Sequence, residues 1–217
     1  MEIELRQERP SDYRQSEIVT REAFWNRFAP GCSEHYLLHV LRECPAFVPQ
    51  LDVVALHGGR IVANAVCLRS VIRTDDGSES EVLTLGPISV LPQYQRKGIG
   101  GRLIEYLKAQ ARSMGFRAIL LCGDPDYYLR QGFTAAETKG IRTADDMYAA
   151  ALHVCELYEG SLKGITGRYL ENAVYEIDEA AAARFDTGFP PKALVAGTPS
   201  QKRFGRIAAL RKRFDPK

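Results

Sequence analysis

Three glycines and three cationic side chains lie together between residues 95 and 102, in the stretch QRKGIGGR. The stretch follows an apolar run typical of a strand and precedes a run with the spacing of an amphipathic helix. A helix begins with about four backbone amides that lack partners, and its dipole is positive there. Glycines let these amides approach an anion closely, and Arg96, Lys97 and Arg102 add cationic donors. These residues therefore predict a binding site for phosphate or pyrophosphate.

Two common nucleotide-binding patterns do not fit this turn. The nucleoside-triphosphate loop requires a lysine and then Ser or Thr after its last glycine, and the dinucleotide fingerprint requires a third glycine that this chain lacks. A glycine-bearing helix start without any ligand is the alternative that the stretch alone leaves open.

The turn is positioned by the elements expected on either side of it. Alternating apolar residues predict two strands, 53–57 and 61–73, joined by a tight glycine hairpin. A third run, 82–91, completes an antiparallel meander, and Pro87 interrupts it. Because proline cannot donate to a sheet ladder, we expect this strand to leave its neighbour there and to open backbone groups to a ligand.

Further elements are expected before and after this unit from periodicity and capping residues. They are a strand at 1–6, helices beginning near Pro10 and Ser33, a long helix to Ser113, a strand at 117–122, a short helix from Pro125, an alternating strand at 147–158, a strand at 169–177, a helix at 178–186 and a basic amphipathic helix at 202–214.

The order of these elements, with QRKGIG at 95–100 between strand and helix, resembles the GCN5-related N-acetyltransferase (GNAT) family, whose hallmark is Gln or Arg, two residues, Gly, one residue, and Gly or Ala. LGPISV at 85–90 and GDPDYYLRQGF at 123–133 make the chain similar to the bacterial YhbS-like subgroup of predicted acetyltransferases, over residues 1 to about 135. The resemblance implies an α/β fold (an α+β mixed sheet): a central, mostly antiparallel sheet, splayed at the cofactor strand and flanked by helices, with a C-terminal extension.

The resemblance further implies an acyltransferase that moves an acetyl group from acetyl-CoA to a primary amine, foremost of a small molecule, by direct attack through a tetrahedral intermediate. Acetyl-CoA is then the cosubstrate, and no metal is expected. The pyrophosphate would lie on the turn, and the pantetheine arm would run along the splayed strand. The cofactor-binding residues implied in this way are Ile88, Ser89, Val90, Gln95, Arg96, Lys97, Gly98, Ile99, Gly100, Gly101 and Arg102.

The resemblance also implies a proton donor for the departing CoA sulfur. Tyr128 falls where the family usually has this tyrosine, and its neighbour Tyr127 would point about 100° away on a helix. Many relatives carry an asparagine near the end of the preceding strand, where this chain reads CGD at 122–124. We expect Asp124 to cap the short helix instead.

The sequence does not decide which residue acts as the general base. Some relatives carry a glutamate at the position of Thr84, which cannot serve, and others use water or receive a neutral amine. Other candidates lie in the N-terminal helices, which wall the acceptor site in this fold. They are Glu22, Glu34, His35 and His39, with Glu34 and His35 leading as base or acceptor-site residues.

Residues 1–160 are expected to form the acetyltransferase domain, and residues 161–217 an extension that completes or flanks it. The tail, 201–217, carries seven basic side chains against one acidic side chain. It could dock on the acidic body, bind nucleic acid or another acidic partner, or remain solvated. Because no nucleic-acid motif is present, we do not expect nucleic acid as a partner.

The composition, with 45% hydrophobic and 26% charged residues, is typical of a globular protein, and no apolar run predicts a membrane span. Five irregularly spaced cysteines argue against zinc and against a disulfide framework. We therefore expect a cytoplasmic protein without membrane association, whose partner is a small-molecule amine acceptor, and leave a homodimer open. A non-catalytic sensor of CoA or acyl-CoA is the alternative function, because no clear base is present.

Overall fold

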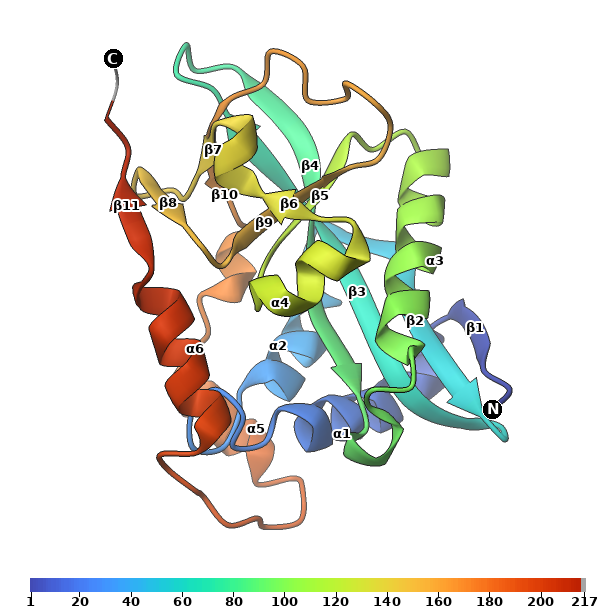
Figure 1. Cartoon of the computed structure of the whole chain (residues 1–217). Helices are drawn as coiled ribbons and strands as arrows, with labels where there is room; N and C mark the ends of the chain where they lie inside the picture. Colours follow the sequence, from blue (N-terminus) through green and yellow to red (C-terminus); the bar gives the residue numbers. More distant parts are fainter. Residues whose placement is uncertain (216–217) are drawn as a thin grey trace.

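A mixed sheet of nine strands forms the centre of the molecule within residues 1–215, the part of the chain that the computed structural model describes (Figure 1). The strands are β1 (Glu4–Gln7), β2 (Phe47–His57), β3 (Arg60–Arg73), β4 (Glu79–Val90), β5 (Ala118–Cys122), β6 (Thr134–Ala135), β7 (Ile141–Arg142), β8 (Met147–Ala149), β9 (Leu152–Glu156), β10 (Gly167–Leu170) and β11 (Arg211–Arg213). The α-helices are α1 (Tyr13–Phe24), α2 (Glu34–Leu41), α3 (Ile99–Ser113), α4 (Pro125–Tyr128), α5 (Glu179–Asp186) and α6 (Pro199–Ala209). No helix in this described part is long and apolar enough to cross a membrane.

The strand order of the main sheet is β1-β2-β3-β4-β5-β9-β6, with β10 paired to both β3 and β7. The predicted meander is confirmed, because β2, β3 and β4 pair antiparallel in sequence order. Gly58 and Gly59 make the first hairpin with φ angles of 56° and 75°, a region that glycine enters at little cost. The sheet and its flanking helices agree with the predicted fold class.

Side chains along the central strands alternate between two hydrophobic clusters, as the two-residue period of a strand requires. On one face, Leu83 of β4 packs in the same cluster as Leu103 and Leu107 of α3. On the other face, Leu68 of β3 packs with Leu38 of α2. Burying such a leucine contributes about 1.5–3 kcal/mol. The sheet is thereby enclosed between α3 on one side and the N-terminal helices on the other.

β4 and β5 separate soon after they begin to pair. Their parallel pairing covers only two residue pairs, the second of which joins Thr84 to Leu120. Beyond this pair, β4 stays bonded to β3 as far as Val90, and β5 stays bonded to β9 as far as Cys122. The two strands form the arms of a V. The strand thus leaves one neighbour, β5, but it does so after Thr84 rather than at Pro87, and it stays paired with β3 past Pro87 through a register shift.

Two strands predicted in the C-terminal half are longer than the strands in the structure, so their predicted bounds are wrong. The alternating run 147–158 is divided into β8 and β9, because β8 pairs with β11 whereas β9 pairs with β5 and β6. The strand predicted at 169–177 ends at Leu170, and a 3-10 helix follows at Ala173–Tyr175. In both places a tertiary contact ends the strand before the apolar pattern does.

β10 brings the C-terminal part of the chain to the V. Its antiparallel pairing with β3 places Tyr169 opposite Ile72. Tyr169 is buried, and its hydroxyl lies 2.5 Å from Oγ1 of Thr84. Tyr175, in the 3-10 helix that follows, donates from its hydroxyl to the carbonyl of Gly86 at 2.8 Å. Both hydroxyls therefore attach this segment to β4 where β4 leaves β5.

The described part of the basic tail, residues 201–215, docks on acidic groups of the body, which is the first of the three arrangements considered for it. Residues 216 and 217 lie outside the described part of the chain. The predicted helix 202–214 is wrong at its end, because α6 stops at Ala209 and β11 then pairs with β8 (Figure 1). Arg203 lies 2.6 Å from carboxylate oxygens of both Asp124 and Asp126. Exposed ion pairs contribute little to stability, so these contacts mainly orient the tail.

The attachment of β10 can be tested by removing one hydroxyl. Tyr169→Phe leaves the buried hydroxyl of Thr84 without its partner, so we expect the free energy of unfolding to fall by about 1–3 kcal/mol. Urea denaturation followed by circular dichroism measures the change. Tyr148→Phe is the matched control, since the ring of Tyr148 makes an edge contact with Phe214 that the variant keeps. Equal losses in the two variants would contradict the anchoring role of Tyr169.

Candidate active site

The edge of β4 that faces β5 has no strand partner from Gly86 to Val90 within the described residues. Unpaired backbone groups of this kind require water or a ligand as partner. The strand is fixed from behind, because Oγ of the buried Ser89 donates to Oγ1 of Thr20 in α1 at 3.0 Å. Thr20 in turn donates to Oδ1 of Asn64 at 3.1 Å. This buried chain of hydrogen bonds holds the open edge in place.

The start of α3 lies directly beyond this edge and carries no capping side chain. Gly98 is the N-cap residue, with a φ of 82°, and it offers no side-chain acceptor to the first turn. The amides of Ile99, Gly100 and Gly101 therefore belong to a helix start whose positive end is uncovered. Such a start is suited to an anion.

The polar side chains of this turn have different roles in the structure. Gln95 donates from Nε2 to the carbonyl at the end of β4 at 2.9 Å, which closes the turn on the strand. Arg102 donates to the carbonyl of Ile3 at 2.8 Å, which ties α3 to the N-terminus. Arg96 and Lys97 are exposed. The structure thus uses Gln95 and Arg102 to shape the turn and presents two cations to the solvent beside it.

Tyr127 and Tyr128 touch each other but have different neighbours. Their ring centroids are 4.9 Å apart and the rings are inclined at 77°. A Cβ atom added at Gly100 would lie 2.5 Å from the hydroxyl of Tyr127, so Tyr127 reaches the first turn of α3. Tyr128 packs against Gly123, and its ring centroid lies 6.0 Å from that of His153. Burial raises the pKa of both phenols, which keeps them protonated at neutral pH.

The sequence CGD at 122–124 has a structural explanation. The ring of Tyr128 lies against the Cα of Gly123, so a larger residue cannot stand there. Asp124 accepts a hydrogen bond from the amide of Asp126 at 3.0 Å and caps α4, which confirms its predicted role. The hydrogen bonds from Arg203 hold the pKa of Asp124 below its usual value. Asp124 is therefore committed to positioning α4 and α6.

The sequence of the chain also matches the model of a known protein family. The model of the acetyltransferase (GNAT) family matches residues 11–133, more than half of the chain, including β4, the glycine turn and both tyrosines. The chain belongs to the GNAT family. The resemblance seen in QRKGIG and its flanking motifs is thereby confirmed.

Two curated relatives from Escherichia coli K12 are N-acetyltransferases described as uncharacterized. YjhQ is 33% identical over 97 residues, which cover 45% of this chain and 53% of YjhQ. YhbS is 27% identical over 146 residues, which cover 67% of this chain and 85% of YhbS. This GNAT chain thus spans about half the length of YjhQ and most of YhbS.

Two solved structures share the fold. The crystal structure of YhbS from Escherichia coli in complex with CoA aligns with a TM-score of 0.72 at 23% identity, over 81% of this chain and 92% of that chain. A GNAT acetyltransferase from Brucella melitensis in complex with acetyl-CoA aligns with a TM-score of 0.65 at 29% identity, over 80% and 98%. These complexes support acetyl-CoA as the cosubstrate, as predicted. No cluster of three or more metal-ligating side chains occurs in residues 1–215.

The leading base candidates of this GNAT chain, Glu34 and His35, lie in different surroundings. His35 is fully buried, with Nε2 3.0 Å from Oδ1 of Asp186 and Nδ1 3.6 Å from Sγ of Cys32. Burial lowers the pKa of His35 to about 4. Glu34 is half-buried at the start of α2, and burial raises the pKa of its carboxyl. The side chain of His35 is therefore enclosed in the protein, whereas that of Glu34 is partly exposed to solvent.

The other two candidates contact polar partners, Glu22 in an ion pair and His39 beside a carboxylate. Glu22 lies 2.8 Å from Nζ of Lys192. Nδ1 of His39 lies 3.0 Å from Oε1 of Glu17. None of the four base candidates lines the cavity that the structure has where β4 and β5 separate.

A cavity of about 450 Å³ lies where β4 and β5 separate. It is lined by Cys122, Thr143, Ala144, Asp145, Leu152, Tyr169, Leu170, Glu171, Asn172, Tyr175 and Glu176. Cys122 is the last residue of β5, and Tyr175 bonds the carbonyl of Gly86 on β4, so the lining touches both arms of the V. Tyr169 packs in the cluster of the face away from α3. The cavity therefore opens on the face opposite α3.

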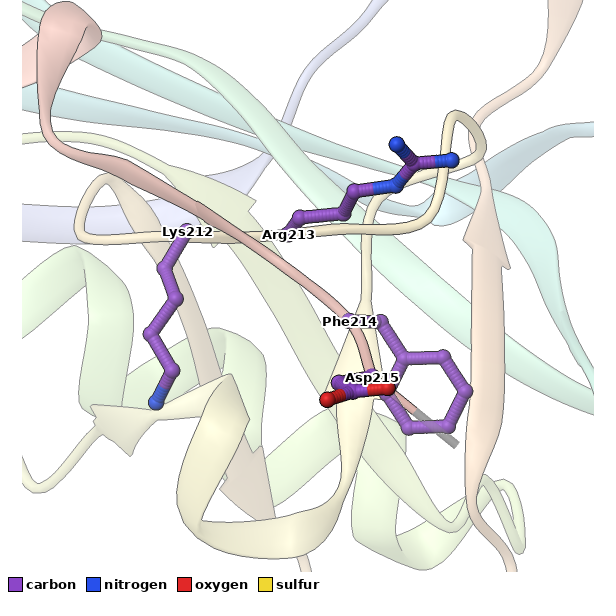
Figure 2. A pocket seen from close by; sticks show the side chains of 4 residues that line it. All are labelled: Lys212, Arg213, Phe214 and Asp215. Atoms are coloured by element: carbon purple, nitrogen blue, oxygen red, sulfur yellow. The ribbon is translucent and has the colours of Figure 1, made fainter. Parts of the chain in front are cut away.

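A second hollow, of about 640 Å³, lies at the C-terminal end of the described chain. Figure 2 shows its lining side chains, Lys212, Arg213, Phe214 and Asp215, which all come from one extended segment. It includes no described residue of β4, β5 or α3. We therefore do not assign it to the GNAT site.

The cavity residues between 169 and 176 could not be predicted from the sequence. They lie outside residues 11–133, which the family model matches, and they form no recognisable motif. The alternating pattern from Tyr169 did predict a strand, but a pattern does not say which strand becomes its neighbour. Only the pairing of β10 with β3 brings these residues to the V.

His35 should make the free energy of unfolding depend on pH. Its pKa of about 4 in the folded protein lies below the ordinary 6.5, so the unfolded chain binds more protons between these values. The stability from the neutral ring is complete above the ordinary pKa and is lost as the pH falls towards 4, by up to about 3 kcal/mol. In the His35→Gln variant, the free energy of unfolding measured in urea should fall less steeply as the pH decreases towards 4. The same slope in both proteins would contradict the account.

Proposed function

We propose that this protein transfers an acetyl group from acetyl-CoA to a primary amine of a small molecule. The observation that carries the proposal is the unpaired edge of β4 from Gly86 to Val90, which leads to the uncapped start of α3. The edge offers backbone groups to an arm that contains amides, and the helix start offers amides and a positive dipole end to pyrophosphate. CoA combines these two chemistries in one molecule.

The residues present fit the two ends of this cofactor. The amides from Arg96 to Gly101 would hold the pyrophosphate, with the exposed side chains of Arg96 and Lys97 adding charge. The backbone groups of Ile88 and Val90 would bond the pantetheine arm, while Ser89 turns its side chain to α1. Gln95 and Arg102 would act mainly by holding the turn in shape.

Bound acetyl-CoA supplies an activated acetyl group as a thioester. An amide N–H of Ile88 or Val90 would stabilise the negative charge that develops on the carbonyl oxygen. Tyr128 would donate its proton to the departing sulfur, and burial keeps its phenol protonated for this role. The cavity of about 450 Å³ has the size of a small-molecule site, which supports a small acceptor.

The helix start can be tested at Gly100. Gly100→Ala adds a Cβ atom 2.5 Å from the hydroxyl of Tyr127, so the Tyr127 side chain has to shift at the first turn of α3. We expect the Kd for acetyl-CoA to rise about tenfold or more, equivalent to about 1.4 kcal/mol, measured by isothermal titration calorimetry. Gly205→Ala in α6 is the control, because its added Cβ atom meets no atom within 4 Å. Equal affinities in both variants would argue against cofactor binding at this turn.

The enzymatic proposal is tested by the CoA thiol. Acetyl-CoA should raise the Tm of the protein, and a panel of amines should include acceptors that release free thiol. Tyr128→Phe should lower kcat about 10- to 100-fold with little change in acetyl-CoA affinity, because it removes only the proton donor. Tyr127→Phe is the comparison, and a larger loss there would assign the donor to Tyr127 instead. Binding of acetyl-CoA without thiol release from any amine would favour a sensor.

A further inference from the structure

The Glu171 carboxylate lines the cavity at the V, and in the described chain no hydrogen bond or ion pair engages it. Glu171 directly follows β10, whose last residue, Leu170, lies opposite Val71 of β3. The preceding Tyr169 is buried and bonded to Thr84. The residue itself is exposed, but its backbone belongs to a segment that the sheet fixes in place. The position of Glu171 at the V is therefore fixed by the strand pairing and the hydrogen bond of the residues directly before it.

The cavity is acidic. Asp145, Glu171 and Glu176 line it, whereas no lysine or arginine of the described chain does. Arg211 compensates Asp145, with Nη2 at 2.6 Å from its carboxylate. The charges of Glu171 and Glu176 remain, so a cation enters this cavity more favourably than an anion.

β4 offers no acid of its own inside the V. Its residues from Thr84 to Val90 include no carboxylate, and the two hydroxyls among them, of Thr84 and Ser89, are already bonded to Tyr169 and Thr20. A proton acceptor at this place must therefore come from another segment. Within the described chain, Glu171 and Glu176 are both unpartnered carboxylates on the segment that is bonded to β4 here. Of the two, Glu171 is the one whose charge acts on Cys122 at the end of β5.

Glu171 and Tyr128 approach the end of β5 from opposite faces of the sheet. Tyr128 packs against the cluster that contains α3, whereas Glu171 follows Tyr169 of the cluster on the other face. Cys122 lies near both. The pKa of Cys122 is raised, first by burial of its thiol and second by the charge of Glu171. Cys122 is in turn one of the groups that raise the pKa of Tyr128.

We propose that this cavity binds the acceptor as a cationic primary amine and that Glu171 takes up the proton that the ammonium group must lose. The inference rests on the proposed acetyl transfer and adds to it the charge of the substrate and the identity of the base. The residues that would recognise the cation are Glu171 and Glu176, both outside the part of the chain that the family model matches.

The step balances in protons and electrons. The ammonium nitrogen gives one proton to Glu171, and its lone pair then forms the bond to the acetyl carbon. The carbon–sulfur bond breaks, its electron pair stays on sulfur, and Tyr128 protonates the sulfur. The second proton that nitrogen loses restores Tyr128, and Glu171 releases its proton to water. The products are an acetamide, CoA thiol and one proton in solution.

The surroundings of Glu171 support its role as a base. Although the residue is exposed overall, neighbouring groups partly desolvate its carboxyl and raise its pKa above the ordinary value of 4.5, which makes it a stronger proton acceptor than a fully solvated glutamate. The carboxylate form is lost as the pH falls through this raised pKa. We therefore expect kcat/KM for the amine to fall on the acid side in the wild-type protein.

The test is Glu171→Gln, which keeps the size of the side chain and removes the proton acceptor. With putrescine as the cationic acceptor, we expect kcat/KM to drop at least about tenfold near neutral pH. The deficit should shrink as the pH approaches the pKa of the free amine, because solvent then supplies the neutral form. The Kd for acetyl-CoA should change less than about twofold, since Glu171 lies across the sheet from the cofactor turn. Glu159→Gln, at an exposed glutamate away from the cavity, is the control and should behave as wild type.

Three outcomes would overturn the inference. The first is a Glu171→Gln variant with wild-type kcat/KM and an unchanged pH profile. The second is a preference for an anionic amine such as glutamate over putrescine. The third is a wild-type protein that acetylates neutral amines and yet acetylates no cationic amine. By contrast, failure to bind acetyl-CoA, or binding without thiol release from any amine, would reject the proposed function itself. Calorimetry with acetyl-CoA and the thiol assay over the whole amine panel distinguish those failures from the other three outcomes.

Discussion

The short pairing between β4 and β5 is the constraint on which the site depends. Two parallel strands that separate after Thr84 and Leu120 leave backbone groups unpaired, and unpaired groups in a sheet are costly unless water or a ligand satisfies them. The glycine turn follows at the end of one arm, so the open edge and the uncapped helix start form one continuous surface. The cavity occupies the other face of the same opening. In the proposed reaction, a cofactor on this surface and an acceptor in the cavity would meet through the V.

The C-terminal extension belongs to this arrangement and is more than an appendage. β10 lengthens the sheet beside β3, and the hydroxyls of Tyr169 and Tyr175 bond β4 at Thr84 and Gly86. The same segment supplies the carboxylate of Glu171 to the cavity. The surface that we propose for the cofactor lies within the family match, whereas most of the proposed acceptor cavity does not.

Local rules were enough to predict the cofactor side of the molecule. The glycine cluster, the helix that follows it and the interruption at Pro87 each depend on neighbours in sequence, and the structure has all three. The acceptor side depends on contacts between distant segments. The run 147–158 alternates throughout, but two different partners divide it into β8 and β9. Likewise, nothing in the sequence near Glu171 indicates that it would lie beside Cys122, because only strand pairing brings them together. His35 shows the same limit, since its enclosure comes from Asp186 and aromatic rings of the extension.

A crystal structure of the protein with bound CoA tests the central claim most directly. The account predicts that the pantetheine amides bond the backbone of β4 between Gly86 and Val90, within about 3.5 Å, and that the sulfur ends in the V with Tyr128 on one face and Glu171 on the other. A pantetheine arm bound away from β4, or a sulfur atom that does not reach the cavity lined by Glu171, would contradict it.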